Sequence, residues 1–320
     1  MPPRQPNISV PRLNALEQWL DELGMNQHDR IHQAIRKVRE HYFWETPPDM
    51  DEPWYARTLF DAEHDVIEFL DIFDAFESEP HELIAPKIER ASSGVLSPVD
   101  ERSEKADARN IQFELSLAAE WRLNGLDVKI GEPDFTLFVG TTKFIVECKR
   151  PYSEGSVRSN VKSANRQLGP QLDKDANAFG AIAISVSRIV VPPDALFISE
   201  SLLPSVQRDP ERHLRALLRE SRERAYTSED ITLMWTPRLG QEMDALAKRT
   251  RWRNFDCHER VVGIFFHAAP HFAHATGLSG RMALSMIGSI GTEGPAFTYL
   301  ESATGIAYNR GWRVPLHRKL

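Results

Sequence analysis

Residues 179–186 constrain the fold most, because they form a nearly continuous apolar run that includes Ile182, Ile184 and Val186. A strand of this kind is buried on both faces of a sheet, so other elements must cover both of those faces. The preceding segments supply such elements. We expect a helix over residues 103–124, strands over 126–130, 134–139 and 143–149, and a helix over 157–176. This order favours an α/β fold with a mixed sheet and flanking helices.

The first hundred residues have a different pattern, in which apolar residues recur at helical spacing between polar or proline-rich interruptions. We expect two helices within residues 11–43, a third over 55–76 and a fourth over 81–90, followed by a linker over 91–102. The pattern changes near Ser97 and Pro98. We therefore predict an acidic all-helical domain over residues 1–97. A second domain would span residues 98–320, with its core at about residues 103–190.

The C-terminal part gives weaker patterns. We expect a helix over residues 204–226, a strand over 231–235, a helix over 239–248 and strands over 260–266 and 282–290. These segments would form an α/β extension of the second domain.

The charge is unevenly distributed along the chain. Residues 1–100 carry 20 acidic and 9 basic side chains, whereas residues 101–320 carry 26 acidic and 30 basic ones. A polyanionic ligand would be repelled by the first part and tolerated by the second. The acidic part could shield a site, bind a regulatory protein partner or mediate homodimerisation. The alternative is that both parts are ordinary solvated surfaces.

Composition excludes several classes of protein. The chain has 320 residues, and its two cysteines, Cys148 and Cys257, are too few for a disulfide scaffold or a multi-cysteine zinc module. No apolar stretch reaches the roughly 18 residues that span a bilayer, and the first residues lack the apolar region of a secretory signal. We therefore expect a cytoplasmic protein without membrane contact. The phosphate loop of ATPases and the serine elbow of α/β hydrolases are also missing from the sequence.

Residues 133–149 carry the chemistry. Side chains alternate along a strand, so Glu147 and Lys149 point to one face and Cys148 to the other. A hairpin through residues 140–142 would return Asp134 to the strand end where Glu147 lies. Converging carboxylates suit Mg²⁺, which prefers oxygen ligands and keeps several waters. A bound metal lowers the pKa of an attacking water, so phosphodiester hydrolysis is the reaction that fits this set.

These residues resemble the motif of the PD-(D/E)xK, or restriction-endonuclease-like, nuclease superfamily. Pro133 and Asp134 followed by Glu147-x-Lys149 match the motif, and the predicted order of elements over residues 103–190 is similar to the family core. The resemblance implies that Asp134, Glu147 and the backbone carbonyl of Cys148 bind Mg²⁺, or Mn²⁺ in its place. It also implies that Lys149 positions or activates the attacking water.

The resemblance implies further site residues on the two flanking helices. Many members use an acid on the helix before the first strand, for which Glu114 is the candidate and Glu120 the second choice. Some carry a glutamine on the helix after the lysine, a role that Gln167 would fill, with Gln171 one turn later on the same face. The alternative is that the motif residues form an ordinary surface ion pair at a sheet end.

Two basic clusters are candidates for contact with a nucleic-acid backbone. The first would form one stripe on a helix and consists of Arg208, Arg212, Arg215, Arg219 and Arg222. The second consists of Arg249, Arg251, Trp252 and Arg253, whose indole could stack on a base. Solvated helix faces with interleaved glutamates are the alternative. The histidines His267, His271 and His274 fit a loop or core role better than a metal site, because Pro270 interrupts their spacing.

The sequence therefore predicts a metal-dependent nuclease, with DNA a better candidate than RNA from the resemblance. A conditional role in defence against foreign DNA or in repair follows by analogy only. The alternative is a catalytically silent module that binds nucleic acid or takes part in an assembly on the same fold.

Overall fold

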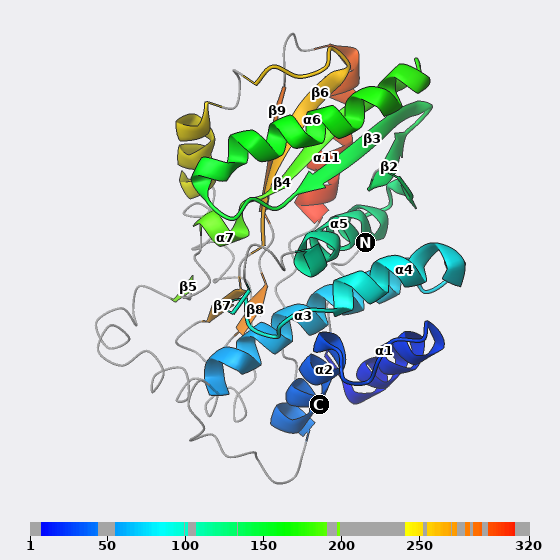
Figure 1. Ribbon diagram of the computed structural model, residues 1–320, viewed down its shortest axis with the longest axis vertical. Helices are drawn as coiled ribbons and strands as arrows, with labels where there is room; N and C mark the ends of the chain where they lie inside the picture. Colours follow the sequence, from blue (N-terminus) through cyan, green and yellow to red (C-terminus); the bar gives the residue numbers. More distant parts are fainter. Residues whose placement is uncertain are drawn as a thin grey trace.

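The computed structural model describes residues 8–43, 55–98, 100–101, 107–132, 134–190, 197–198, 241–251, 255–269, 271–273, 279–281, 284–289 and 294–310. The main sheet and the helix α6 lie in the upper half of Figure 1, and the N-terminal helices lie in the lower half. Within the described residues, no helix has the length and apolar character needed to cross a membrane.

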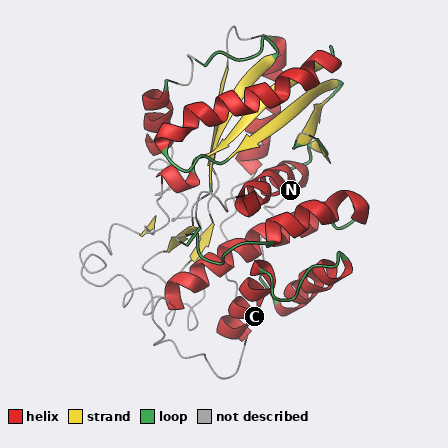
Figure 2. Cartoon of the chain, viewed as in Figure 1, coloured by secondary structure: helices red, strands yellow, loops and turns green. Residues whose placement is uncertain are grey.

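A six-stranded mixed sheet forms the centre of the α/β part (Figure 2). Its strands are β1 (Asp127–Ile130), β2 (Phe135–Val139), β3 (Thr142–Lys149), β4 (Ala178–Ser185), β6 (Val261–Ala268) and β9 (Leu284–Ser289), in that spatial order. The pairs β3–β4 and β4–β6 are parallel, and the other neighbouring pairs are antiparallel. The predicted α/β class with a mixed sheet and flanking helices is confirmed.

The hairpin between β2 and β3 confirms the predicted pairing. Phe135 lies opposite Val146, and Val139 lies opposite Thr142. The turn therefore has only two residues, and Gly140 adopts φ 59° there, a left-handed conformation that glycine enters without steric strain. Because this register is fixed, the residue before β2 lies beside the end of β3.

The two faces of the sheet bury different side chains. Phe144, Val146 and Cys148 of β3 belong to a buried cluster that includes α5 (Asp107–Leu123). Ile145 belongs instead to a cluster with α6 (Val157–Lys174) and the described helical residues 241–250. This alternation is the period-two pattern of a strand that is buried on both sides.

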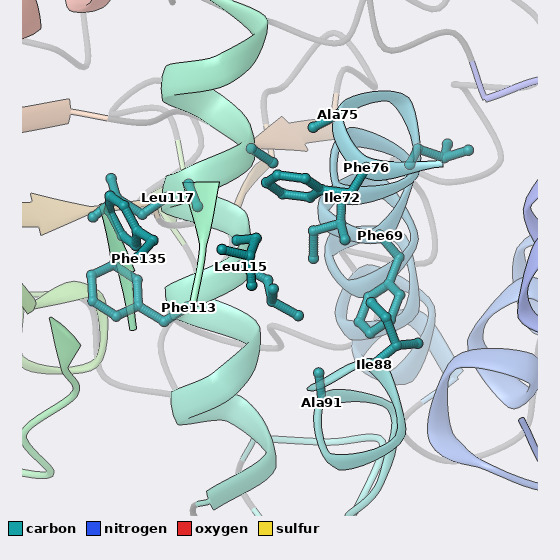
Figure 3. Close-up of a cluster of buried hydrophobic side chains, with 14 of the residues drawn as sticks. Phe69, Ile72, Ala75, Phe76, Ile88, Ala91, Phe113, Leu115, Leu117 and Phe135 are labelled. Carbon is teal, nitrogen blue, oxygen red and sulfur yellow. The ribbon is translucent and has the colours of Figure 1, made fainter. Parts of the chain in front are cut away.

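The helix α5 lies between the sheet and the N-terminal helices. Those helices are α1 (Val10–Glu22), α2 (Arg30–Phe43), α3 (Tyr55–Phe76) and α4 (His81–Ser92). Figure 3 shows Phe113 and Leu117 of α5 directed toward Phe135, whereas Leu115 is directed toward α3. One buried cluster therefore continues from α1 to the sheet. The division into domains at residue 97 stays a prediction, and this cluster crosses the expected boundary.

A buried ionic network joins the same layers. Asp65 of α3 pairs with Arg30 of α2 and, at 2.9 Å, with Arg109 of α5. The side chains of Arg30 and Asp65 are fully buried. Gln112 of α5 donates to Asp65 at 3.0 Å and accepts a hydrogen bond from Arg30 at 2.8 Å. Buried charges require such partners, so α2, α3 and α5 are held in one arrangement.

The C-terminal predictions have mixed outcomes. The expected segments 204–226 and 231–235 lie outside the described residues, whereas residues 241–250 are helical as expected. The strands β6 and β9 confirm the two later strand predictions. The sequence pattern did not predict the short elements η2 (Glu154–Ser156), α7 (Ser187–Val190), β5 (Phe197–Ile198), β7 (His271–Ala273) and β8 (Ser279–Arg281), nor α11 (Pro295–Arg310).

Candidate active site

A cleft of about 730 Å³ lies at the C-terminal end of β3, where side chains from α4, α5 and α6 meet. The ionisable side chains in its wall include Lys87, Glu114, Asp134, Glu147 and Lys149. The C-terminal end of a buried parallel strand is a common place for a functional site in α/β proteins. Four of these five residues were expected from the sequence.

Asp134 is held at the cleft by the backbone of β3. Its Oδ2 accepts a hydrogen bond from the N–H of Cys148 at 2.5 Å. This contact follows from the hairpin register, because Asp134 immediately precedes β2 and β2 begins opposite Val146. The predicted approach of Asp134 to the Glu147–Lys149 end of β3 is therefore confirmed.

Glu147 and Lys149 lie on one face of β3 and form an ion pair, through Glu147 Oε1 and Lys149 Nζ. The Glu147 side chain is only 1% exposed. Its second oxygen, Oε2, is buried and has no hydrogen-bond partner. A buried carboxylate oxygen without a partner is costly, so Glu147 has a free ligand position at the cleft.

Glu114 approaches from α5 and is paired with Lys87 of α4. The Glu114 side chain is 3% exposed, and Lys87 Nζ also donates to the backbone carbonyl of Asp134 at 3.2 Å. Glu114 lines the cleft, as expected for the first choice on this helix. Glu120 is buried elsewhere along α5 and is not part of the cleft wall.

Burial raises the pKa of all three carboxyl groups. For Glu114, burial and the charge of Asp134 raise the pKa to about 8. For Glu147, the same two causes raise the pKa to about 7. Burial also raises the pKa of Asp134, although the Cys148 N–H and the ammonium groups of the cleft oppose the shift. A cation among these groups would favour their charged forms.

The side chains of the cleft supply only some of the oxygen ligands that a hard divalent cation such as Mg²⁺ takes. Over the described ranges, no group of three or more His, Cys, Asp or Glu side chains is arranged to hold a metal ion. Mg²⁺ does not require such a group, because it binds through one or two carboxylates and keeps several waters. Asp134 and the free oxygen of Glu147 supply this minimal set. Burial raises the pKa of the Cys148 thiol well above its usual range, so Cys148 could contribute its carbonyl but not a thiolate.

The helix α6 brings Gln167 to the rim of the cleft, together with Asn160 two turns earlier on the same face. Gln167 is exposed, so its amide can reach a molecule in the cleft. Gln171 does not line the cleft. The structure thus brings the first of the two glutamines to the site.

The basic clusters are only partly described. Arg212, Arg215, Arg219 and Arg253 lie outside the described residues, together with Arg208, Arg222 and Trp252. Arg251 is exposed in the turn after residues 241–250, away from the cleft wall. Arg249 pairs with Glu154 at 3.0 Å. Contact of these residues with nucleic acid stays a prediction.

His267 occupies the core, as expected. It is buried on β6, where its Nδ1 lies 2.7 Å from Ser285 Oγ and its ring packs against Phe113. His271 lies in β7, and His274 lies outside the described residues.

Sequence reasoning missed three basic residues of the cleft, Lys87, Arg90 and Arg150. Arg150 follows the motif lysine directly, and it pairs with Glu101 at 2.9 Å. Arg188 pairs with the same carboxylate at 3.0 Å and lies over the ring of Tyr152. Adjacency to Lys149 could have identified Arg150. No local signal identifies Lys87, because its helix belongs to the N-terminal part.

Comparison with known proteins assigns no family to this arrangement. A scan against protein-family models and searches of curated proteins and of solved structures found no match to the chain.

Proposed function

We propose that the protein is a metal-dependent nuclease that hydrolyses phosphodiester bonds in the cleft at the end of β3. One observation carries the proposal: Asp134, Glu147 and Lys149 meet at this cleft, and the second oxygen of Glu147 is buried without a hydrogen-bond partner. Buried polar atoms are normally satisfied, so this oxygen is available to a ligand.

Each residue has a specific task in this proposal. Asp134, Glu147 and the carbonyl of Cys148 would hold Mg²⁺, or Mn²⁺ in its place. When bound, the metal lowers the pKa of a water and stabilises the charge that develops on the phosphate. Lys149 positions the attacking water and donates a hydrogen bond to it from the ammonium group. Gln167, at the cleft rim, would bind the substrate backbone through its amide.

The order of elements supports a restriction-endonuclease-like core. The chain passes through α5, three antiparallel strands, α6 and then β4, which is parallel to β3. This is the helix–strand–strand–strand–helix–strand order that the sequence resemblance implies. DNA is the proposed substrate on the same basis, and a role in defence or repair follows from it by analogy.

Cleavage assays test the proposal. Purified protein is incubated with plasmid, single-stranded DNA or RNA, with Mg²⁺ and with EDTA. We expect Mg²⁺-dependent cleavage that Asp134→Ala abolishes and Lys149→Met reduces by about 100-fold or more, as for loss of a general acid–base group. Lys143→Met is the matched control, because Lys143 is on the same strand and pairs with Asp175 at the surface. Activity that survives both site changes would defeat the assignment.

A catalytically silent nucleic-acid-binding or assembly module is the second candidate. It is favoured by the fact that Glu114 and Glu147 each have a lysine partner within the protein. In that case the cleft would need no metal. Binding that weakens with salt, without cleavage of any substrate, would support this candidate over the nuclease.

A further inference from the structure

We propose that Lys87 serves as a fixed internal cation at Glu114 and so limits the cleft to one divalent cation, held at Asp134 and Glu147. This inference rests on the proposed function and deepens it, because it assigns a role in the site to the N-terminal helices.

Lys87 occupies the oxygens that a second cation would need. Its Nζ contacts Glu114 Oε1 and lies 3.2 Å from the backbone carbonyl of Asp134. Both partners are oxygen ligands of the kind that Mg²⁺ and Mn²⁺ prefer. The Lys87 side chain is 15% exposed, so the ammonium group is largely withdrawn from water and directed to these oxygens.

Packing of α4 holds Lys87 in this position. Ile84, Ile88 and Ala91 are buried in the core on one face of the helix. Leu83, Lys87 and Arg90 follow the adjacent face at the same spacing and line the cleft. The packed apolar residues of α4 therefore hold the backbone of Lys87 beside the cleft, within reach of Glu114.

The charges of the cleft are balanced for one metal ion. The cleft wall has five carboxylates and four basic side chains, which leave a formal charge of −1 when all of them are ionised. One bound divalent cation changes the net charge of the cleft from −1 to +1, so a second cation would be repelled. Without Lys87 the formal charge of the cleft is −2, which the first divalent cation only neutralises, so a second would not meet a net positive charge.

The carboxylates at the two ends of the cleft have different partners, as this assignment requires. The buried Oε2 of Glu147 has no hydrogen-bond partner, which marks the end that accepts the metal. At the other end, Lys87 contacts both Glu114 and the Asp134 carbonyl. A lysine that served only as a structural tie would have no effect on the number of ions bound.

Mn²⁺ titration followed by electron paramagnetic resonance counts the ions bound per chain. We expect one ion in the wild type, two in Lys87→Met, and one in Lys87→Arg, which restores the positive charge. Lys143→Met is the matched control, because Lys143 pairs with Asp175 and does not line the cleft. It should bind one ion.

Each other result overturns the inference. One ion in a folded Lys87→Met variant makes Lys87 a structural tie, and two ions in the wild type remove its limiting role. If Lys87→Met does not fold, Lys87→Gln replaces it, with the same expectation of two ions. A wild type that binds no Mn²⁺ and cleaves no nucleic acid defeats the proposed function as well, so the two failures are distinguishable.

Discussion

Asp134 and its two carboxylate neighbours are more costly to ionise in the folded chain than in water. Burial raises the pKa of each group, and the charge of Asp134 adds to the shift at Glu114 and Glu147. Such an arrangement destabilises the folded chain, and shifted pKa values of this kind are typical of binding and catalytic sites. The cleft therefore contains electrostatic strain that a bound cation would relieve.

Asp134→Asn tests this strain. The amide oxygen can still accept the hydrogen bond from Cys148, while the negative charge is removed. We expect a Tm in EDTA equal to or above that of the wild type, together with loss of metal-dependent cleavage. The control Asp127→Asn, on the exposed edge of β1, should change neither property. A Tm well below the wild type would show that Asp134 stabilises the fold instead.

Strand periodicity was sufficient to predict that Glu147 and Lys149 share a face, and hairpin length was sufficient to bring Asp134 to them. Lys87 could not be predicted in this way. Its position depends on how α4 packs on α5, and helix packing angles are not encoded in the local periodicity of either helix.

At the scale of elements, α5 joins the two parts of the molecule. The helix expected over residues 103–124 is buried both against the sheet and against α3 (Figure 3). A helix buried on several sides has a weak amphipathic pattern, so the sequence signal was small. Its polar residues Arg109 and Gln112 are buried in the network around Asp65.

Asp65→Ala should destabilise the protein strongly. The change leaves Arg30 and Arg109 buried without their carboxylate partner, and loss of one member of a buried pair costs about 3–5 kcal/mol. Asp74→Ala is the control on the same helix, because Asp74 pairs with Arg12 near the surface and should cost at most about 1 kcal/mol. Urea denaturation measures both values. Equal effects would mean that the network does not hold α3 against α5.

The start of α2 should respond to pH. Asp29 accepts hydrogen bonds from the backbone and ring of His32, each at 3.0 Å. The hydrogen bond to Asp29 raises the pKa of His32 above 6.5, against the effect of burial. Burial would raise the pKa of Asp29, but the hydrogen bonds from His32 outweigh it and lower the pKa below 3.8.

The directions of the two pKa shifts determine how the stability changes with pH. The stabilisation by charged His32 is complete below pH 6.5 and is lost as the pH rises through the raised pKa. The part due to Asp29 is present above pH 3.8 and is lost as the pH falls through its lowered pKa. The Tm difference between the wild type and His32→Gln should therefore be larger at about pH 5.5 than at about pH 9. A difference independent of pH would contradict this.

Element boundaries were predicted well where apolar periodicity is strong. The third helix, Tyr55–Phe76, has the predicted limits, and β4 differs by one residue. The short strands β5, β7 and β8 were missed, because two or three residues are too few to establish a period.

At the scale of the whole molecule, the N-terminal helices are part of the core and also supply Lys87 to the cleft. The prediction of a separate acidic domain came from a change of sequence pattern and of charge near residue 97. Neither of these signals records which apolar faces meet. The roles first considered for this part, shielding, partner binding and dimerisation, stay predictions.

Removal of residues 1–97 should prevent stable folding of the rest. Leu115 would lose its contacts with α3, and Arg109 and Gln112 would lose Asp65. We expect residues 98–320 to show no cooperative thermal transition by circular dichroism, whereas the full chain melts cooperatively. A truncated chain that melts cooperatively would establish an independent domain, and its cleavage rate would then test shielding directly.

Crystals of the full chain grown with Mn²⁺ test the central claim most directly, through the anomalous scattering of the metal. The account predicts one anomalous peak in the cleft, in contact with Asp134, Glu147 and the carbonyl of Cys148, with Lys87 still at Glu114. A cleft without a peak, with Lys149 and Lys87 remaining the only cations beside these carboxylates, would contradict it.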